Sequence, residues 1–200
     1  MKNQPLPPQI ILAITGATGA ILGIRALELL RQAEVETHLI ISRPARLTIT
    51  QETDRRIEDI ESLADVVYPP EDIAAPIASG SFPTRGMLVL PCSIKTLSQV
   101  ANAHADNLIA RAADVCLNEG RPLVLAVRET PLHRGHIRLM DLAAASGAII
   151  APPMPVFYHR PQTLEEMTDL IVARLLQRLG INLPGTFQWT GMKTDSQSPG

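Results

Sequence analysis

The sequence is poor in charge and in cysteine. Charged residues make up 19% of the chain and the net charge is -2, so it has no basic excess to bind nucleic acid or an anionic membrane surface. Its two cysteines, Cys92 and Cys116, do not form the pattern of a disulfide scaffold, which favours a reducing compartment. No segment has the run of about 18 consecutive apolar residues that a membrane-spanning helix needs. Residues 1–9 also lack the apolar stretch of a signal peptide. We therefore expect a cytoplasmic protein without nucleic-acid or membrane partners.

Apolar side chains are abundant instead, at 46% of 200 residues. This length suits one domain with one sizeable core. Because charges are few, the surface that remains after one core is filled should be rich in apolar groups, which predicts a homo-oligomer. We expect a short N-terminal tail (1–9), one domain (10–189) and a polar, disordered C-terminal tail (190–200).

Short apolar runs alternate with helical patterns along the chain. The runs that predict strands are 10–15, 37–41, 87–90, 123–127 and 148–150. Helices are expected after the first run, from near Lys95, and over about 164–179, and the polar segment 69–85 is expected as a long loop. This alternation predicts an α/β domain whose mostly parallel sheet lies between two layers of helices.

Four segments with glycine, hydroxyl or charged side chains stand where predicted strands end. They are 16–19, 42–43, 92–96 and 128–130. Because ligands bind beyond the carboxyl ends of parallel strands, we expect these segments to surround one crevice.

The first segment, Gly16 to Gly19, is a glycine turn before a helix that also contains Gly23. Backbone N–H groups and the helix dipole favour a phosphate there, and Thr18 adds a hydroxyl. The spacing differs from the G-x-G-x-x-G dinucleotide fingerprint, which favours a mononucleotide over NAD. The alternative is that the glycines only permit tight helix–strand packing.

Two later segments carry groups suited to an anionic ligand. Ser93, Lys95 and Thr96 offer two hydroxyls and a cation, although Ser93 could equally be an ordinary helix N-cap. Arg128 and Glu129 combine an anion-binding cation with a carboxyl group that can transfer protons.

Other residues have competing interpretations. His133 and His136 have the i, i+3 spacing of a metal pair, but no third ligand accompanies them, so we expect no metal. Arg111 and Arg121 fit solvated helix charges as well as anion ligands. The proline-flanked segment 157–161 either covers a ligand or forms a packed connection. Cys92 fits a small buried filler better than a nucleophile.

Taken together, these segments resemble the flavin prenyltransferase (UbiX) family over almost the whole chain, from Ile10 to about residue 189. The motifs that carry the resemblance are TGATGA (15–20), ETD (52–54), ASGSF (78–82), PCSIKTL (91–97), RAADV (111–115), VRETPLH (127–133) and FYHRPQ (157–162). The resemblance implies a Rossmann-like (flavodoxin-like) three-layer sandwich that assembles into a dodecamer. It also implies metal-independent transfer of a dimethylallyl group from dimethylallyl monophosphate to reduced FMN, giving the prenylated FMN cofactor of UbiD-type decarboxylases.

The same resemblance assigns residues to each ligand. The expected FMN ligands are Gly16, Ala17, Thr18, Ser42, Ser93, Ile94, Lys95, Thr96 and Arg128. The expected prenyl phosphate ligands are Arg111, Tyr158 and Arg174, and the candidate catalytic residues are Glu52, Ser93 and Glu129.

The chemistry of allyl transfer agrees with these assignments. As the allylic carbon–oxygen bond breaks, charge grows on the leaving phosphate, so cations and hydroxyls aimed at it stabilise the transition state. Arg128, Arg174, Tyr158 and Ser93 fit that role. An apolar pocket keeps water from the allylic cation. Protons must also move at the flavin, and either Glu52 or Glu129 could carry them.

One departure from the family leaves other functions open. Asn118 stands where the family often has lysine, so one phosphate-binding cation is absent and the choice between a monophosphate and a diphosphate donor is undecided. A flavin-dependent cysteine decarboxylase is a rival, but residues 152–156 (PPMPV) do not resemble its Asn- and Met-rich substrate clamp. A non-catalytic FMN carrier that associates with a decarboxylase is the other alternative.

Overall fold

Six strands form one sheet at the centre of the computed structural model, which describes residues 8–183. The strands are β1 (Gln9–Ile14), β2 (Glu36–Ile41), β3 (Val66–Tyr68), β4 (Met87–Cys92), β5 (Leu123–Val127) and β6 (Ile149–Ile150). Their order is β3-β2-β1-β4-β5-β6, and every pairing of neighbouring strands is parallel. The winding direction therefore reverses between β1 and β4, as in doubly wound Rossmann sheets.

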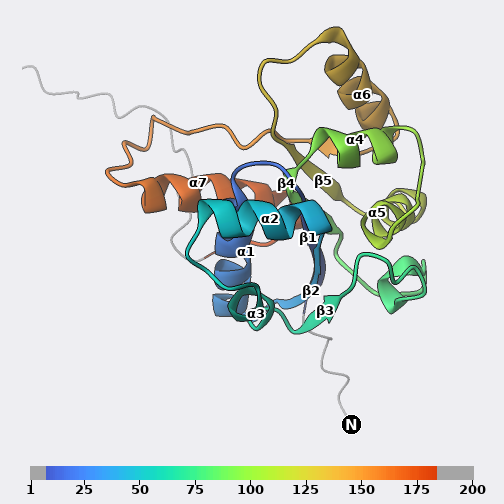
Figure 1. Cartoon of the computed structure of the whole chain (residues 1–200), viewed down its shortest axis with the longest axis horizontal. Coiled ribbons are helices and arrows are strands. Elements are labelled where there is room, and N and C mark those ends of the chain that lie inside the picture. The colour runs from blue at the N-terminus through green and yellow to red at the C-terminus, as the bar shows by residue number, and fades with distance from the viewer. Residues whose placement is uncertain (1–7, 184–200) are drawn as a thin grey trace, which may run out of the picture.

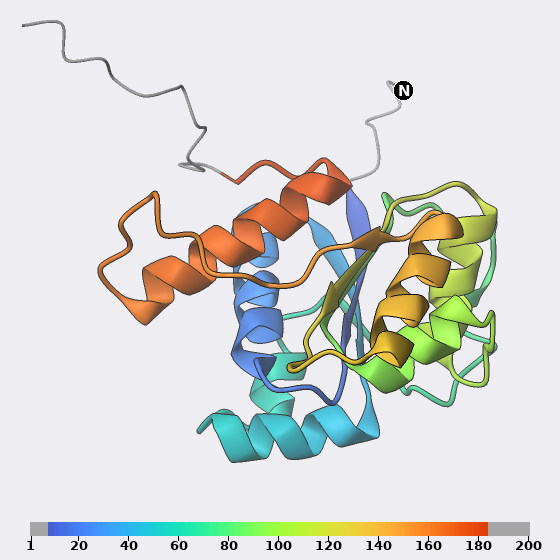
Figure 2. The ribbon, with the colours of Figure 1, turned by 90° about the horizontal axis from the view of Figure 1, so that it is seen from above.

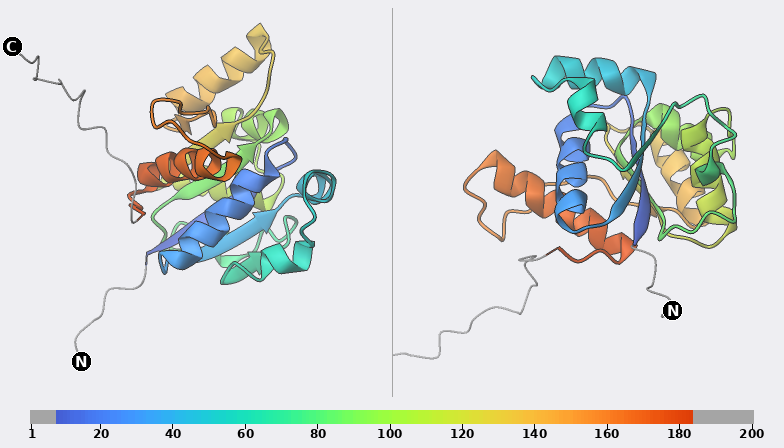
Figure 3. Two further views of the ribbon diagram at one scale, coloured as in Figure 1. Left: turned by 90° about the vertical axis from the view of Figure 1, so that its left-hand side faces the viewer. Right: turned by 90° about the horizontal axis from the view of Figure 1, so that it is seen from below.

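Helices cover both faces of this sheet (Figures 1, 2 and 3). They are α1 (Ala20–Gln32), α2 (Arg43–Glu52), α3 (Ile57–Glu61), α4 (Ile94–Ala101), α5 (Leu108–Asn118), α6 (Arg134–Ala145) and α7 (Leu164–Leu176), with 3-10 turns η1 (Pro76–Ala78) and η2 (Gln177–Leu179). α1 and α7 lie on one face, and α4, α5 and α6 lie on the other (Figure 2). The predicted three-layer α/β sandwich is confirmed.

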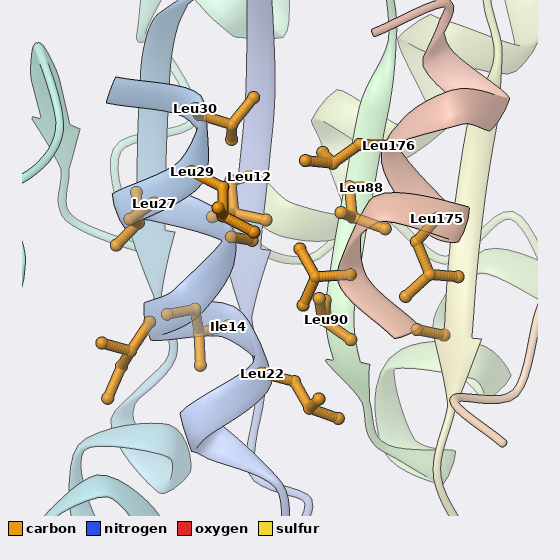
Figure 4. Close-up of a cluster of buried hydrophobic side chains, with 14 of the residues drawn as sticks. Leu12, Ile14, Leu22, Leu27, Leu29, Leu30, Leu88, Leu90, Leu175 and Leu176 are labelled. Atoms are coloured by element: carbon orange, nitrogen blue, oxygen red, sulfur yellow. The ribbon is translucent and has the colours of Figure 1, made fainter. Parts of the chain in front are cut away.

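The two faces of β1 explain why its sequence is continuously apolar. Ile10, Leu12 and Ile14 belong to the core that includes α1 and α7, whereas Ile11 and Ala13 belong to the core that includes α4 and α5. Successive side chains of a strand point to opposite faces, so a strand buried on both sides has no polar alternation. Figure 4 shows the first core, where leucines of α1 and α7 meet leucines of β1 and β4.

Helix α1 approaches the sheet closely at Gly23. A Cβ atom at this position would lie 2.6 Å from the carbonyl oxygen of Leu90 and 2.9 Å from Cγ1 of Ile14. Glycine is therefore needed for packing at this position, which favours the packing interpretation for Gly23.

Thr15, just beyond β1, joins the ends of β1 and β4. It is 1% exposed, and its hydroxyl donates a hydrogen bond to the carbonyl oxygen of Pro91 at 2.7 Å. The same hydroxyl oxygen accepts a hydrogen bond from the N–H of Ser93 at 2.8 Å. Thr15 thus bridges the two strands at the point where the winding reverses.

Most element boundaries agree with the sequence predictions, with three kinds of difference. β4 does not break at Pro91 but continues to Cys92 through a shift of register after Val89, and irregular pairing is where a strand tolerates a proline. The strand β3 was not predicted, because it has only three residues at the sheet edge. Helices α2, α3 and α6 were also not predicted. Each buries at most two of its side chains, as α6 does with Ala143 alone, so none has a strong apolar stripe.

The outer surface carries the apolar groups that composition predicts. Most of the large exposed apolar side chains in residues 8–183 lie between 132 and 164, including Met154, Phe157 and Leu164.

β1 begins at Gln9, within the predicted N-terminal tail, and the predicted C-terminal tail lies outside the described residues. Among the helices of residues 8–183, none has the length and apolar character needed to cross a bilayer.

The Thr15 bridge can be tested with Thr15→Val, which keeps the shape of the side chain. The variant leaves the N–H of Ser93 without its buried partner, and the carbonyl of Pro91 keeps only its bond from the N–H of Thr15 at 3.3 Å. We therefore expect a loss of about 1–3 kcal/mol in the free energy of unfolding. Urea unfolding at fixed protein concentration measures it. Thr50→Val is the matched control, because the Thr50 hydroxyl is exposed and bonds only to the carbonyl of Arg46. Equal stabilities of the two variants would contradict the role of Thr15.

Candidate active site

A cavity of about 930 Å³ lies at the carboxyl end of the sheet. It is lined by the segments that follow β1, β2, β4 and β5, namely 16–18, 42–44, 93–96 and 128–129. The structure thus brings together the four segments that were expected to surround one crevice. Every residue that the family resemblance assigned to FMN lines this cavity.

The glycine turn offers free backbone donors to the cavity. The N–H groups of Gly16 and Thr18 have no hydrogen-bond partner in residues 8–183, whereas the N–H of Ala17 donates to the carbonyl of Thr15 at 2.8 Å. A Cβ atom on Gly16 would lie 2.4 Å from Cβ of Pro44. Gly16 therefore allows the turn to contact the first turn of α2.

Glu52 occupies the start of α1. Its Oε2 atom accepts hydrogen bonds from the N–H groups of Gly19 at 2.9 Å and Ala20 at 3.0 Å. A carboxylate is favourable at a helix N-terminus, so the protein itself fills the anion position that the sequence suggested for a ligand phosphate. Glu52 does not line the cavity, and in this structure its carboxylate holds the turn rather than facing the cavity.

The start of α4 is open to a ligand. Ser93 is its N-cap, as the alternative interpretation proposed, and the Ser93 hydroxyl oxygen accepts a hydrogen bond from the N–H of Thr96 at 3.3 Å. The N–H groups of Ile94 and Lys95 have no partner in the described chain. Ser42 caps α2 in the same way, accepting from the N–H of Ala45 at 3.2 Å. Two capped helices therefore begin at the cavity, where an anion is favoured.

Charged side chains add to this site from three strand ends. Lys95 and Arg128 line the cavity and form no ion pair within the described part of the chain. Arg43 also lines it, and its Nε atom lies 2.7 Å from Oε1 of Glu71 in an exposed ion pair. Glu129 stands beside Arg128, and its carboxylate accepts a hydrogen bond from the N–H of Thr130 at 2.9 Å.

One wall of the cavity was missed by the sequence analysis. It consists of Pro70, Glu71, Ile73, Gln99, Asp106, Asn107 and Ile109. The N–H of Leu108 donates to the carbonyl of Pro70 at 2.8 Å, which joins the two stretches. Asp106 accepts hydrogen bonds from the side-chain amides of Gln99 and Asn107. Apart from Gln99 in α4 and Ile109 in the first turn of α5, these residues belong to connections, so no strand-end signal marks them.

The expected prenyl phosphate ligands lie elsewhere. Arg111 on α5 pairs with Asp114 at 2.9 Å, and Tyr158 is 61% exposed on the segment before α7. Arg174 lines a separate cavity of about 210 Å³ beside Pro152 and Met154. A single subunit therefore does not bring Arg111, Tyr158 or Arg174 to the main cavity.

The cysteines are buried and poorly suited to nucleophilic chemistry. Burial raises the pKa of Cys92 to about 12 and that of Cys116 to about 11. At neutral pH both are thiols, and the thiolate is the nucleophilic form. This agrees with the prediction that Cys92 is a small buried filler.

Comparison with known proteins places the chain in a family. The Flavoprotein family matches residues 2–179. The flavin prenyltransferase UbiX of Escherichia coli K12 is 52% identical over 186 residues, which is 92% of this chain and 98% of that protein. The flavin prenyltransferase UbiX of Thauera aromatica is 50% identical over 183 residues, covering 92% and 94% of the two chains.

Solved structures of UbiX-like proteins are also similar to this chain. AnUbiX (PadA1), crystallised with FMN and dimethylallyl pyrophosphate, superposes with a TM-score of 0.91 at 44% identity, covering 94% of this chain and 100% of that one. A dodecameric FMN-dependent UbiX-like decarboxylase from E. coli O157:H7 gives 0.88 at 46% identity, covering 92% and 100%. The FMN-dependent cysteine decarboxylase TvaF, at 16% identity and a TM-score of 0.63, shares only the fold. The chain therefore belongs to the flavin prenyltransferase UbiX family.

Proposed function

We propose that this chain is a flavin prenyltransferase that joins the dimethylallyl group of dimethylallyl monophosphate to reduced FMN. The observation that carries the proposal is the cavity at the reversal between β1 and β4, where free N–H groups, hydroxyls and cations from four strand ends converge. Family membership supports it, and so does the relative that was crystallised with FMN and a dimethylallyl donor. The product, prenylated FMN, serves UbiD-type decarboxylases.

The residues of the cavity fit FMN. The free N–H groups of Gly16 and Thr18 and the start of α4 suit a phosphate or the polar ribityl chain. Ile73, Ile94 and Ile109 provide apolar surface for a flat ring. FMN supplies the ring that accepts the prenyl group, and the protein supplies position, charge and exclusion of water.

Four residues have proposed roles, three in the transfer and one in positioning. Lys95 and Arg128 stabilise negative charge as the phosphate leaves, because neither is neutralised by an ion pair in the described structure. Glu129, which lines the cavity, moves protons at the flavin. Glu52 has a positioning role, since its carboxylate fixes the start of α1 next to Thr18.

The remaining ligands need a second subunit. We propose a homo-oligomer, a dodecamer like the E. coli relative, in which neighbouring chains complete the prenyl phosphate site with Tyr158 and Arg174. The exposed apolar side chains around Met154 and Phe157 support an interface there. We also place the protein in the cytoplasm, because both cysteines are free thiols.

A non-catalytic FMN carrier is the second candidate, favoured by one observation. Asn118 stands where a cation is expected, and its side-chain amide lies 3.4 Å from Asp114, the same carboxylate that pairs with Arg111. A carrier would bind FMN and leave it unchanged. The two functions therefore differ in the fate of the flavin.

Mass spectrometry of the flavin separates the two functions. The purified protein is incubated anaerobically with reduced FMN and either dimethylallyl monophosphate or the diphosphate. We expect a flavin heavier by one five-carbon prenyl unit with the monophosphate, and the diphosphate arm defines the donor preference. Bound FMN of unchanged mass with both donors would favour the carrier.

Glu129→Gln tests the proton-transfer role. The amide keeps the size of the side chain but cannot act as an acid or base, so we expect prenylated FMN to form at least about 10²-fold more slowly while FMN affinity is retained. Single-turnover kinetics and flavin fluorescence titration measure the two quantities. Glu165→Gln is the control, because Glu165 is 77% exposed on α7 and lies outside the cavity. Unchanged turnover in Glu129→Gln would remove this residue from the mechanism.

A pair of substitutions tests how Glu52 positions the turn. In Glu52→Gln the side-chain carbonyl can still accept from the N–H groups of Gly19 and Ala20, whereas Glu52→Ala removes the acceptor. We expect Glu52→Ala to weaken FMN binding several-fold more than Glu52→Gln, because the loss of an N-cap acceptor costs about 1 kcal/mol. Equal FMN affinities in fluorescence titrations would show that the turn does not need this contact.

A further inference from the structure

The two halves of α7 are packed differently against the rest of the subunit. The second half places Ile171 and Leu175 in the core that it shares with α1, whereas residues 164–170 contain no fully buried side chain. Figure 2 shows the first half of α7, together with the segment before it, projecting past α1. The first half therefore has less apolar packing to fix its position than the second half.

The segment that carries Tyr158 is attached to this first half of α7. The N–H of Val156 donates to the sulfur of Met167 at 3.4 Å, and the N–H of Gln162 donates to Oε2 of Glu166 at 2.6 Å. Tyr158 lies between these two attachment points along the chain. A movement of the first half of α7 therefore moves Tyr158 with it.

Arg25 of α1 holds the first half of α7 through Asp169. The Nε and Nη2 atoms of Arg25 donate to the two carboxylate oxygens of Asp169 at 2.5 and 3.0 Å, and its Nη1 atom donates to Glu28 at 2.8 Å. Two parallel bonds from a planar guanidinium fix both the distance and the orientation of a carboxylate. The Arg25 side chain is only 20% exposed, so water screens this pair less than it screens a surface ion pair.

A second ion pair holds Arg25 from the other side. Oε1 of Glu28 lies 2.9 Å from Nη2 of Arg55, which follows the connection that begins after Glu52. Asp169, Arg25, Glu28 and Arg55 thus form a chain of ion pairs that runs from α7 across α1. This chain holds α7 against the helix that begins at the glycine turn of the flavin cavity.

The position of Asp169 bears on both of the ligands proposed for the prenyl phosphate. Arg174 lies five residues further along α7, about 7.5 Å along the helix axis. An error of about 1 Å in the placement of a group can slow a reaction about 10²-fold. A small shift of α7 at Asp169 would therefore displace Arg174 and Tyr158 while leaving the strand ends around the flavin cavity in place.

We propose that Arg25 is a positioning residue for the dimethylallyl donor. Its bidentate pair with Asp169 fixes the first half of α7, and through α7 it places Tyr158 and Arg174 for the donor. Arg25 does not line the flavin cavity, so FMN binding does not depend on it. This inference rests on the proposed function and deepens it, because it adds a residue that controls donor affinity from outside the site.

Donor binding to the full-length protein loaded with oxidised FMN tests the proposal. The proposed reaction needs reduced FMN, so calorimetric titration with dimethylallyl monophosphate measures affinity without turnover. We expect the Kd of the donor to rise at least about tenfold in Arg25→Gln and in Asp169→Asn, with the Kd of FMN unchanged within about twofold. Arg25→Lys keeps the charge but not the bidentate geometry, so its loss of donor affinity should be intermediate.

A second bidentate pair provides the matched control. Arg56 donates to the two carboxylate oxygens of Asp59 at 2.8 and 2.6 Å, but both residues lie at the start of α3 and the pair does not reach α7. Arg56→Gln should therefore leave donor affinity unchanged. The double variant of Arg25→Gln and Asp169→Asn should bind the donor about as weakly as Arg25→Gln alone, because both changes remove one shared interaction.

Hydrogen exchange separates positioning of α7 from a general loss of stability. In Arg25→Gln we expect the backbone amides of residues 164–170 to exchange faster than in the wild type, because local opening of this half costs less without the ion pair. The amides of residues 171–176, which are held by the core, should exchange at the wild-type rate.

Several outcomes would overturn the proposal. They are an unchanged donor Kd in Arg25→Gln and Asp169→Asn, an equal loss in Arg56→Gln, or a fall in FMN affinity as large as the fall in donor affinity. If Arg25→Gln does not fold, Asp169→Asn decides by the same criteria. A wild-type protein that forms no prenylated FMN would refute the proposed function instead, and hydrogen exchange would still show whether Arg25 holds α7.

Discussion

The active-site region depends on how β1 and β4 are held together where the winding of the sheet reverses. Helix α1 leaves β1 on one face of the sheet and α4 leaves β4 on the other, so the loops diverge and open a space between them. The hydroxyl of Thr15 bridges the two strands below this space, with one bond to Pro91 and one to Ser93. The glycine turn and the start of α4 are thereby fixed relative to each other.

The helix N-termini of this region differ in whether their N–H groups are already hydrogen-bonded within the protein. Each start presents N–H groups without partners inside the helix. At α1 the carboxylate of Glu52 takes two of them, whereas at α4 those of Ile94 and Lys95 stay free beside the cavity. An anionic ligand is therefore directed to the side of the cavity nearest α4, where Lys95 and Arg128 also lie.

The sequence predicted the cavity residues that follow strands, but not those on the connections, and the reason is physical. Buried parallel strands such as β1 and β5 are continuous apolar runs, so their ends, and the polar residues after them, can be read directly. Asp106 and Ile73 lie on connections whose positions are set by tertiary contacts, such as that between Leu108 and Pro70. Family resemblance predicts Tyr158 and Arg174 as prenyl phosphate ligands, but no pattern in one chain reveals that they lie outside its own cavity.

The close contact between Gly16 and Pro44 has a consequence for protein engineering. Because a side chain at residue 16 would collide with Pro44, the β1 turn and the first turn of α2 form one wall whose shape is not adjustable. Another part of the lining, with Ile73 and Ile109, belongs to a loop and to the first turn of α5. Libraries intended to enlarge the cavity for longer donors should vary that part of the lining and leave the glycine turn unchanged.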